Sequence, residues 1–139
     1  MTKEVDNVTD ALITAALDAR CNAYAPYSKY PVGAALLVEG GHIINGCNVE
    51  NASYGLTQCA ERTALCTAIA QNFRRVTCCV VVTSDGSAPC GACRQSLAEF
   101  SDPGYPMRIL CVTPDRKVRM DMWLTDLLPN AFGFGGRES

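Results

Sequence analysis

Residues 76–83 read VTCCVVVT, a continuous apolar run with the length of one β-strand. A strand with one face in water alternates polar and apolar residues, whereas this run predicts a strand buried on both faces. Helical patterns precede and follow it along the chain. The run therefore predicts a sheet that is covered by helices on both sides.

Outward from this strand, the sequence predicts helices and further strands in alternation. The helices are expected at residues 7–24, 58–71, 93–100 and 124–129, with Asn7 as the cap of the first. The other strands are expected at residues 32–39, 42–50, 107–113 and 118–123, the first two forming a hairpin around Gly40 and Gly41. This order predicts an α/β fold in one domain over residues 1–139, a three-layer α-β-α sandwich around a five-stranded mixed sheet.

The connection between the last two strands decides their relative direction. Only the four residues PDRK, 114–117, lie between Thr113 and Val118. A tight turn needs no more than this, but a parallel crossover needs a dozen residues or more. The last two strands are therefore expected to be antiparallel.

Composition and charge exclude several classes of protein. With 139 residues and 48% hydrophobic content, the chain can bury a core of its own, and its formal net charge of −2 provides no basic surface for nucleic acid. No run of about 18 apolar residues is present to span a membrane. The first 20 residues carry acids where a secretion signal would be basic, and the cysteine count, nine, is odd. We therefore expect a cytoplasmic protein with reduced thiols.

Three cysteines stand in settings that suggest a shared metal ion. Cys59 opens the motif CAE at 59–61, and Cys90 and Cys93 form the motif PCGAC at 89–93. Each lies at the start of an expected helix, where unpaired backbone N–H groups favour the metal-binding thiolate over the thiol. Three sulfur ligands indicate a zinc site with an open position for water.

A closed structural zinc site is the alternative, and it needs a fourth protein ligand. The remaining candidates are less well placed in the sequence, because they lie on strands or far along a helix: Cys66, Cys78, Cys79 and His42. We interpret the cysteines outside the motifs as small buried hydrophobic residues: Cys21, Cys47, Cys66, Cys78, Cys79 and Cys111.

Charged residues beside the cysteines fit a catalytic site. Three thiolates around one divalent ion leave a net negative charge, and Arg62, three residues after Cys59, lies on the same helical face to offset it. Arg94, directly after Cys93, is a second candidate for this role. Either arginine could instead be an ordinary exposed charge. Glu61 could move protons beside a metal-activated water, or simply favour the helix N-terminus.

At this point the chain resembles the homotetrameric zinc-dependent cytidine deaminases of pyrimidine salvage. The segments that carry the resemblance run in order along the chain: AYAPYSKYPVGAALL at 23–37, GCNVENASYG at 46–55, CAERTAL at 59–65, PCGACRQ at 89–95 and DLLPNAF at 126–132. The resemblance implies one zinc ion per subunit, held by Cys59, Cys90 and Cys93. It also implies that zinc hydroxide attacks C4 of cytidine or 2′-deoxycytidine while Glu61 moves the protons, which yields uridine or 2′-deoxyuridine and ammonia.

The same resemblance implies the residues that hold the substrate. Asn48 and Glu50 would bind the ribose hydroxyls, as strand positions i and i+2 that share one face. Tyr30 would contact the base where the family usually has phenylalanine, and Ala60 is a further substrate-binding residue. Neighbouring subunits of a homotetramer would complete each pocket with two aromatic residues, Tyr54 and Phe132. The segment SDGSAP before Cys90 is short for the family, and Ala88 replaces a more usual serine.

Other functions remain to be weighed. Polynucleotide-editing deaminases share the zinc motif, but their last two strands are parallel, which PDRK does not allow. A mononucleotide would need basic residues for its phosphate, and Glu50 would repel it. A nucleoside-like antibiotic is a possible substrate, although the motif NVEN favours a plain nucleoside. A non-catalytic zinc-binding module would need a fourth ligand and would have no use for Glu61.

Overall fold

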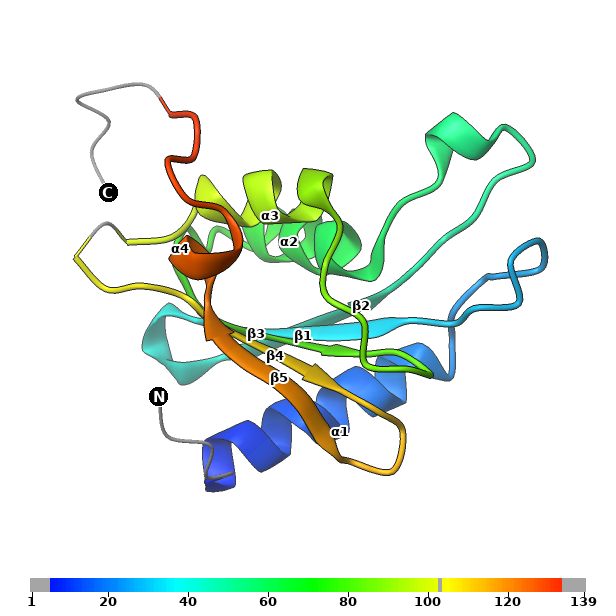
Figure 1. The fold of residues 1–139 in the computed structure, drawn as a ribbon, viewed down its shortest axis with the longest axis horizontal. Coiled ribbons are helices and arrows are strands. Elements are labelled where there is room, and N and C mark those ends of the chain that lie inside the picture. Colours follow the sequence, from blue (N-terminus) through cyan, green and yellow to red (C-terminus); the bar gives the residue numbers. More distant parts are fainter. Residues whose placement is uncertain (1–5, 103, 134–139) are drawn as a thin grey trace.

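The computed structural model describes residues 6–102 and 104–133, and Figure 1 shows their arrangement. The helices are α1 (Asn7–Arg20), α2 (Ala60–Ala70), α3 (Gly91–Ala98) and α4 (Leu124–Leu127), with 3₁₀ turns at Glu39–Gly41 and Tyr54–Leu56. The strands are β1 (Gly33–Val38), β2 (Ile43–Cys47), β3 (Val76–Val82), β4 (Arg108–Val112) and β5 (Val118–Trp123). The first five residues of the acidic N-terminal stretch lie outside the described residues.

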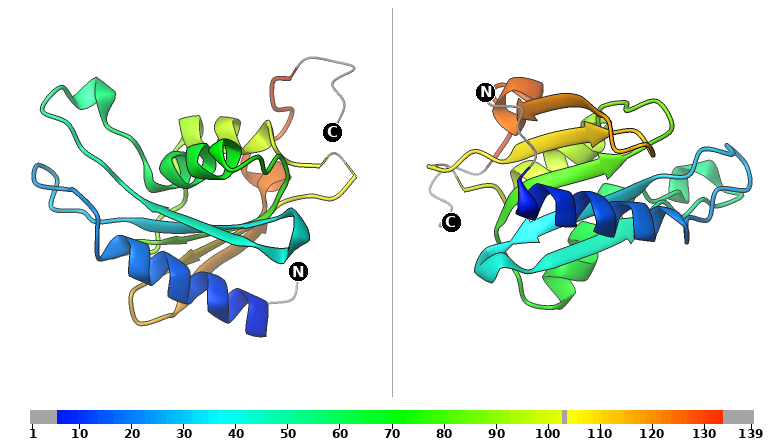
Figure 2. Two further views of the ribbon diagram at one scale, coloured as in Figure 1. Left: turned by 180° about the vertical axis from the view of Figure 1, so that it is seen from behind. Right: turned by 90° about the horizontal axis from the view of Figure 1, so that it is seen from below.

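The strands form one five-stranded sheet in the order β2-β1-β3-β4-β5. Helix α1 covers one face of this sheet, while α2 and α3 lie together on the other (Figures 1 and 2). The three-layer α-β-α sandwich expected from the sequence is therefore confirmed. Within residues 6–102 and 104–133, no helix has both the length and the apolar character needed to cross a bilayer.

Strand β3 is the centre of the fold because both of its faces are buried. Its residues Cys79 and Val81 pack into the core beneath α2 and α3, together with Leu65 and Leu97. The residues between them, Cys78, Val80 and Val82, pack on the other side against α1 through Leu12, Ile13 and Ala16. The lack of polar alternation in this strand thus has the physical reason expected, namely a helical layer on each side.

The strand directions also follow the sequence. Strand β3 pairs in parallel with β4, and α3 supplies the crossover between them. Strands β4 and β5 are antiparallel, as the short PDRK turn requires. The chain leaves the carboxyl end of β3 at Val82 and enters α3 at Gly91, so the loop between them lies at the sheet edge where parallel strands commonly present a site.

Several element boundaries differ from those expected. Helix α1 ends at Arg20 rather than at residue 24, because the chain then turns to pair with a later segment: the Tyr24 N–H donates to the Asn48 carbonyl. The cap of α1 is Asp6, whose Oδ1 accepts from the Thr9 N–H at 2.8 Å, and not Asn7. Helix α3 begins at Gly91 and not at residue 93, so that Cys90 itself is the capping residue.

The cysteines outside the motifs differ in burial, and Cys47 is half-buried. Cys78, Cys79 and Cys111 are buried, as expected, and burial raises the pKa of Cys78 and of Cys111 to about 12. The expectation was wrong for Cys21 and Cys66, which are exposed. Cys21 caps the carboxyl end of α1, and Cys66 lies on the outward side of α2, away from its buried residues.

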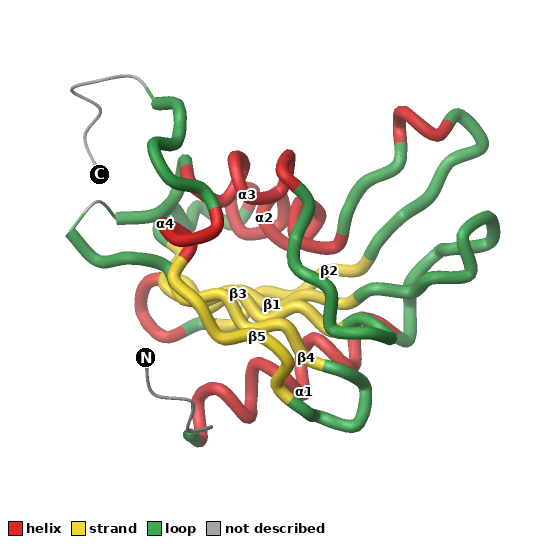
Figure 3. The backbone as a smooth tube through the Cα atoms, viewed as in Figure 1, coloured by secondary structure: helices red, strands yellow, loops and turns green. Residues whose placement is uncertain are grey.

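Two long loops project past the same end of the sheet (Figure 3). They cover residues 21–32 and 48–59 and are joined by backbone hydrogen bonds, for example from the Glu50 N–H to the Tyr24 carbonyl at 2.9 Å. The second loop leads directly into α2. These loops carry several of the expected substrate-binding residues, so the sandwich holds them close to the start of α2.

Gly46 lets α2 lie directly on β2. A Cβ atom at this position would stand 2.5 Å from the Ala64 backbone nitrogen and 2.5 Å from Thr63 Oγ1. The added Cβ atom would clash with the backbone of α2 and push this helix away from β2. We therefore expect G46A to lower the free energy of unfolding by about 2–3 kcal/mol. Urea unfolding measures this change.

The matched control is G55A, because a Cβ atom there meets nothing within 4 Å. This variant should stay within about 0.5 kcal/mol of the parent protein. Equal stabilities of G46A and G55A would contradict the close packing of α2 on β2.

Candidate metal centre and adjoining cavity

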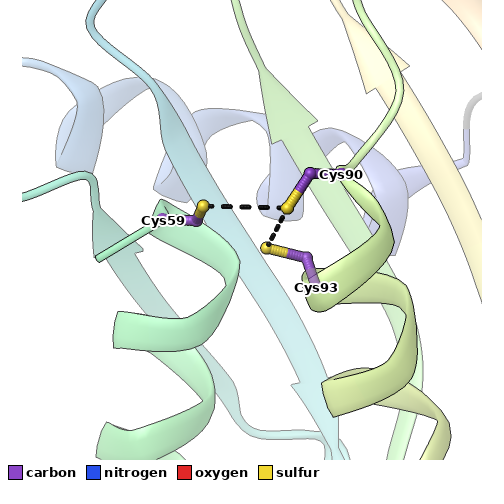
Figure 4. Close-up of side chains that lie close together, drawn as sticks. All are labelled: Cys59, Cys90 and Cys93. Atoms are coloured by element: carbon purple, nitrogen blue, oxygen red, sulfur yellow. Dashed lines mark hydrogen bonds between the residues drawn. The ribbon is translucent and has the colours of Figure 1, made fainter. Parts of the chain in front are cut away.

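The three motif cysteines meet at the N-termini of two helices. Cys59 is the residue before α2, Cys90 is the residue before α3, and Cys93 lies in the first turn of α3. Figure 4 shows the three side chains pointing toward one another. The sulfur of Cys90 is 3.9 Å from that of Cys59 and 3.5 Å from that of Cys93, and all three lie within 4.8 Å of one another.

These distances fit a zinc ion. Zinc–sulfur bonds of about 2.3 Å in tetrahedral geometry place the sulfurs about 3.8 Å apart. The thiols are free, and their separations are far longer than the 2.05 Å or so of a disulfide bond. The three sulfurs could therefore hold zinc with little rearrangement.

The structure brings no fourth ligand to this cluster among the described residues. Of the alternatives, Cys66 is exposed, and Cys78 and Cys79 lie on β3. His42 packs against Phe73, with ring centroids 5.2 Å apart. The arrangement is that of an open metal site, which leaves a position for water or substrate.

The guanidinium group of Arg62 places a positive charge beside the sulfur of Cys59. The neighbouring Cys93 thiol, followed by the Arg62 guanidinium, lowers the pKa of Cys59 to about 5. Arg62 Nη2 lies 3.4 Å from Cys59 Sγ. The buried Nε of Arg62 has no hydrogen-bond partner within residues 6–102 and 104–133.

Arg94 lies at the same helix start but makes different contacts. Its Nε donates to the Pro89 carbonyl and its Nη1 to the Leu127 carbonyl, each at 2.8 Å. These hydrogen bonds end on oxygen and not on sulfur. Arg94 therefore fixes the backbone just before Cys90 and ties it to α4.

Glu61 lies in the first turn of α2 and is only 5% exposed. Burial raises the pKa of its carboxyl group, and the nearby Cys59 thiolate contributes in the same direction. The side chain is not part of the sulfur cluster, yet it lines the adjoining cavity together with Cys59 and Cys90. A buried carboxyl group with a raised pKa beside an open metal position can accept and return a proton.

A cavity of about 310 Å³ opens beside the sulfurs. Four of the expected substrate-binding residues line it: Tyr30, Asn48, Glu50 and Ala60. Its wall continues through Ser87, Ala88 and Pro89, which come directly before Cys90. Volume and lining are suited to one small polar molecule that reaches the metal position at one end.

Asn48 and Glu50 do more than line this cavity. Asn48 Nδ2 donates to the Tyr30 carbonyl at 3.0 Å, and Asn48 Oδ1 accepts from the Val32 N–H at 2.9 Å. Glu50 Oε1 accepts from the N–H groups of Tyr27 and Ser28 at 3.0 and 3.1 Å. Both side chains thus hold the first projecting loop in place, a role that the sequence did not reveal because it depends on contacts between distant segments.

Tyr54 and Phe132 lie on the surface, 73% and 71% exposed. Neither residue lines the cavity beside the sulfurs. Tyr54 belongs to the 3₁₀ turn of the second projecting loop and stacks edge-on against Tyr27, with ring centroids 6.0 Å apart. Both aromatic side chains are accessible to another molecule.

Sequence reasoning missed Asp85, which lies between β3 and α3. Its Oδ1 accepts hydrogen bonds from Tyr30 Oη at 2.6 Å and from Ser87 Oγ at 2.7 Å. The available signal was the run of short polar residues TSDGS at 83–87, directly after a buried strand. Such a run also fits an ordinary turn, so only the contact with Tyr30 distinguishes it.

Three thiolates at two helix starts, with a buried glutamate that is not a ligand, are the pattern of zinc-dependent deaminases. A family model described as the cytidine and deoxycytidylate deaminase zinc-binding region matches residues 6–107. A cytidine deaminase of Sporosarcina psychrophila is 44% identical over 125 residues, or 88% of this chain and 90% of that protein. One from Halalkalibacterium halodurans is 46% identical over 123 residues, covering 87% and 91%.

Solved structures agree with these relatives. The crystal structure of cytidine deaminase from Burkholderia pseudomallei matches with a TM-score of 0.82 and 46% identity, covering 95% of this chain and all of that one. The enzyme from Mycobacterium tuberculosis matches with a TM-score of 0.77 and 41% identity, covering 93% and 100%. The chain therefore belongs to the cytidine deaminase family of zinc-dependent enzymes.

Loss of one motif cysteine should strongly weaken metal binding. We expect C90S to bind zinc at least about 100-fold more weakly, since loss of an outer partner alone costs 10- to 100-fold. The exposed cysteine of α2 offers a control, and C66S should keep its zinc. Metal content after dialysis against a chelator series measures both; equal retention in C90S and C66S would refute this assignment.

Proposed function

We propose that this chain deaminates cytidine and 2′-deoxycytidine hydrolytically, to uridine and 2′-deoxyuridine plus ammonia, as a step of pyrimidine salvage. The observation that carries the proposal is the position of Glu61: a buried, non-ligating carboxyl group that lines the same cavity as Cys59 and Cys90. The 139 residues would act as one domain, with one zinc ion per subunit on Cys59, Cys90 and Cys93.

Bound zinc and Glu61 would have separate roles in the reaction. Bound zinc would supply a Lewis acid that makes water nucleophilic near neutral pH. Glu61 would take a proton from the attacking water, give it to N3 of the pyrimidine, and assist the departure of the amino group. The raised pKa of the Glu61 carboxyl suits this exchange, because the group must be able to hold a proton as well as release it.

The remaining cavity residues would recognise the nucleoside. Asn48 uses one amide hydrogen on the Tyr30 carbonyl and keeps the other for a ribose hydroxyl. Glu50 is a further acceptor for the sugar, and its negative charge would repel a 5′-phosphate. This charge favours a nucleoside over deoxycytidylate, the other substrate in the name of the family model. The ring of Tyr30 would contact the base.

An assembly of four copies is part of the proposal. Tyr54 and Phe132 are exposed, and Leu56, beside Tyr54 in the same 3₁₀ turn, is 62% exposed. In such an assembly these exposed side chains would form contacts with the neighbouring copies. Each cavity would then be completed by aromatic residues of its neighbours. All nine cysteines are free, which favours the reducing cytoplasm as the location.

A non-catalytic zinc-binding module is the competing function from another class. Such a module should tolerate loss of the carboxyl group at Glu61, since the three thiolates alone would hold the metal. We expect E61Q to retain zinc and to lose turnover by about 10²- to 10⁴-fold, the usual contribution of a positioned acid or base. The measurement is the fall in ultraviolet absorbance of cytidine, with metal content determined on the same samples.

A zinc-loaded, folded parent protein that turns over neither nucleoside would favour the module. Equal activities of E61Q and the parent would instead remove Glu61 from the mechanism while leaving the family assignment intact.

Subunit sharing of the cavity can be tested by mixing two impaired variants. If Phe132 acts in the cavity of a neighbour, F132A and E61Q should complement, because a mixed tetramer contains cavities with both groups intact. Refolding the two variants together should yield more activity than the mean of the separate samples. The control is a mixture of C93A and E61Q. Each of these substitutions impairs the cavity of its own subunit, so no cavity of a mixed tetramer is intact. Complementation in this control, or its absence with F132A, would contradict sharing through Phe132.

A further inference from the structure

Tyr30 and Asp85 join two separate walls of the cavity. Tyr30 lines the cavity from the first projecting loop, whereas Asp85 lies 55 residues later, in the loop between β3 and α3. Tyr30 Oη donates to Asp85 Oδ1 at 2.6 Å. This hydrogen bond is short and its acceptor is charged, and such bonds are stronger than those between two neutral groups.

The loop that carries Asp85 has a defined shape. Besides the Tyr30 hydroxyl, Asp85 Oδ1 accepts from Ser87 Oγ at 2.7 Å, from the Ser87 N–H at 3.2 Å and from Thr83 Oγ1 at 3.2 Å. Gly86 adopts a positive φ of 73°, and a Cβ atom there would lie 2.5 Å from Arg119 Cγ. The loop is therefore held from within by Asp85 and from outside by β5.

The other partner is equally fixed. The Tyr30 carbonyl accepts from Asn48 Nδ2 at 3.0 Å, and the Tyr30 N–H donates to Ser28 Oγ at 3.0 Å. Ser28 Oγ in turn donates to Glu50. A chain of hydrogen bonds thus runs from the proposed sugar-binding residues, through Tyr30, to the loop that ends at Cys90.

An ordinary surface contact is the alternative, since Asp85 is exposed and exposed ion pairs and hydrogen bonds contribute little to stability. Two observations argue against it. The ring of Tyr30 lies in the cavity wall, and one carboxylate oxygen collects all four donors. The hydroxyl groups of Tyr30 and Ser87 lower the pKa of Asp85 to about 2, so Asp85 stays an acceptor at every pH of interest.

We propose that Tyr30 and Asp85 form a clasp that holds the cavity in its binding shape. The hydroxyl of Tyr30 fixes the ring as one part of the cavity wall, and Asp85 acts as a positioning residue that fixes Ser87 and Ala88 as another part. The clasp depends on the hydroxyl group of Tyr30, which a phenylalanine at this position would lack. The inference rests on the proposed function.

The clasp should act on substrate binding and not on the chemical step. The hydrogen bonds given for the side chains of Tyr30 and Asp85 involve neither the sulfurs nor Glu61, so we expect loss of the clasp to leave the reacting groups in place while the cavity wall moves. A cavity that must be ordered by its ligand binds more weakly. We expect Y30F to raise KM for cytidine by about threefold to tenfold, the worth of one hydrogen bond, with kcat changed by less than about twofold.

A double-mutant cycle identifies the pair. D85L removes the acceptor at similar size and should raise KM at least as much as Y30F, while D85N keeps an accepting oxygen without the charge and should lie between the parent and D85L. In the D85L background, Y30F should change KM by less than about 1.5-fold, because the bond is already lost. The matched control is Y105F, a tyrosine on a different cavity, which should leave KM unchanged. Additive effects of Y30F and D85L would overturn the proposal.

Hydrogen exchange tests the clasp without relying on turnover, and it remains decisive if D85L does not fold. The Ser87 N–H donates to Asp85 and Thr83, so its exchange should be about threefold to tenfold faster in Y30F than in the parent or in Y105F. A parent enzyme that is active while Y30F alters neither KM nor Ser87 exchange would refute the clasp. A parent that turns over no cytidine would refute the proposed function, and the exchange of Ser87 would then decide the clasp alone.

Discussion

The close approach of three thiolates is the constraint on which the site depends. Sulfurs 3.5 and 3.9 Å apart repel one another when ionised, and the fold gathers positive potential around them. Two helix N-termini meet at the cluster, and Arg62 lies 3.4 Å from Cys59. A divalent ion completes this compensation, so metal affinity and the geometry of the two helices are parts of the same electrostatic problem.

The sandwich meets this requirement by fixing both helices on one face of the sheet. Helix α2 is held close to β2 at Gly46, and α3 is placed by the chain leaving the doubly buried strand β3. Arg94 then ties the residue before Cys90 to α4 through two carbonyl groups. The sulfurs are therefore brought together by packing that extends across the whole domain, and not by the local motifs alone.

In the cavity, the same polar side chains both hold the loops and form part of the lining. Asn48 and Glu50 anchor the first projecting loop while they line the cavity. A substitution at either residue would thus disturb shape and recognition together. Tyr30 and Asp85 extend this arrangement to the loop before Cys90.

The sequence by itself determined the layers and the antiparallel ending of the sheet, because hydrophobic period and loop length are local properties. It also identified Cys59, Cys90 and Cys93 as candidate ligands, but the packing of α2 and α3 brings their sulfurs together. Only the tertiary structure decided where α1 ends and which side chains bond across the cavity. The residue at which helix α1 ends depends on the pairing of Tyr24 with Asn48. The role of Asp85 depends on Tyr30, 55 residues away. Likewise, Cys21 and Cys66 are exposed because of where their helix positions face, which composition cannot reveal. Contacts between distant segments are set by the packing of the whole chain, and no local pattern encodes them.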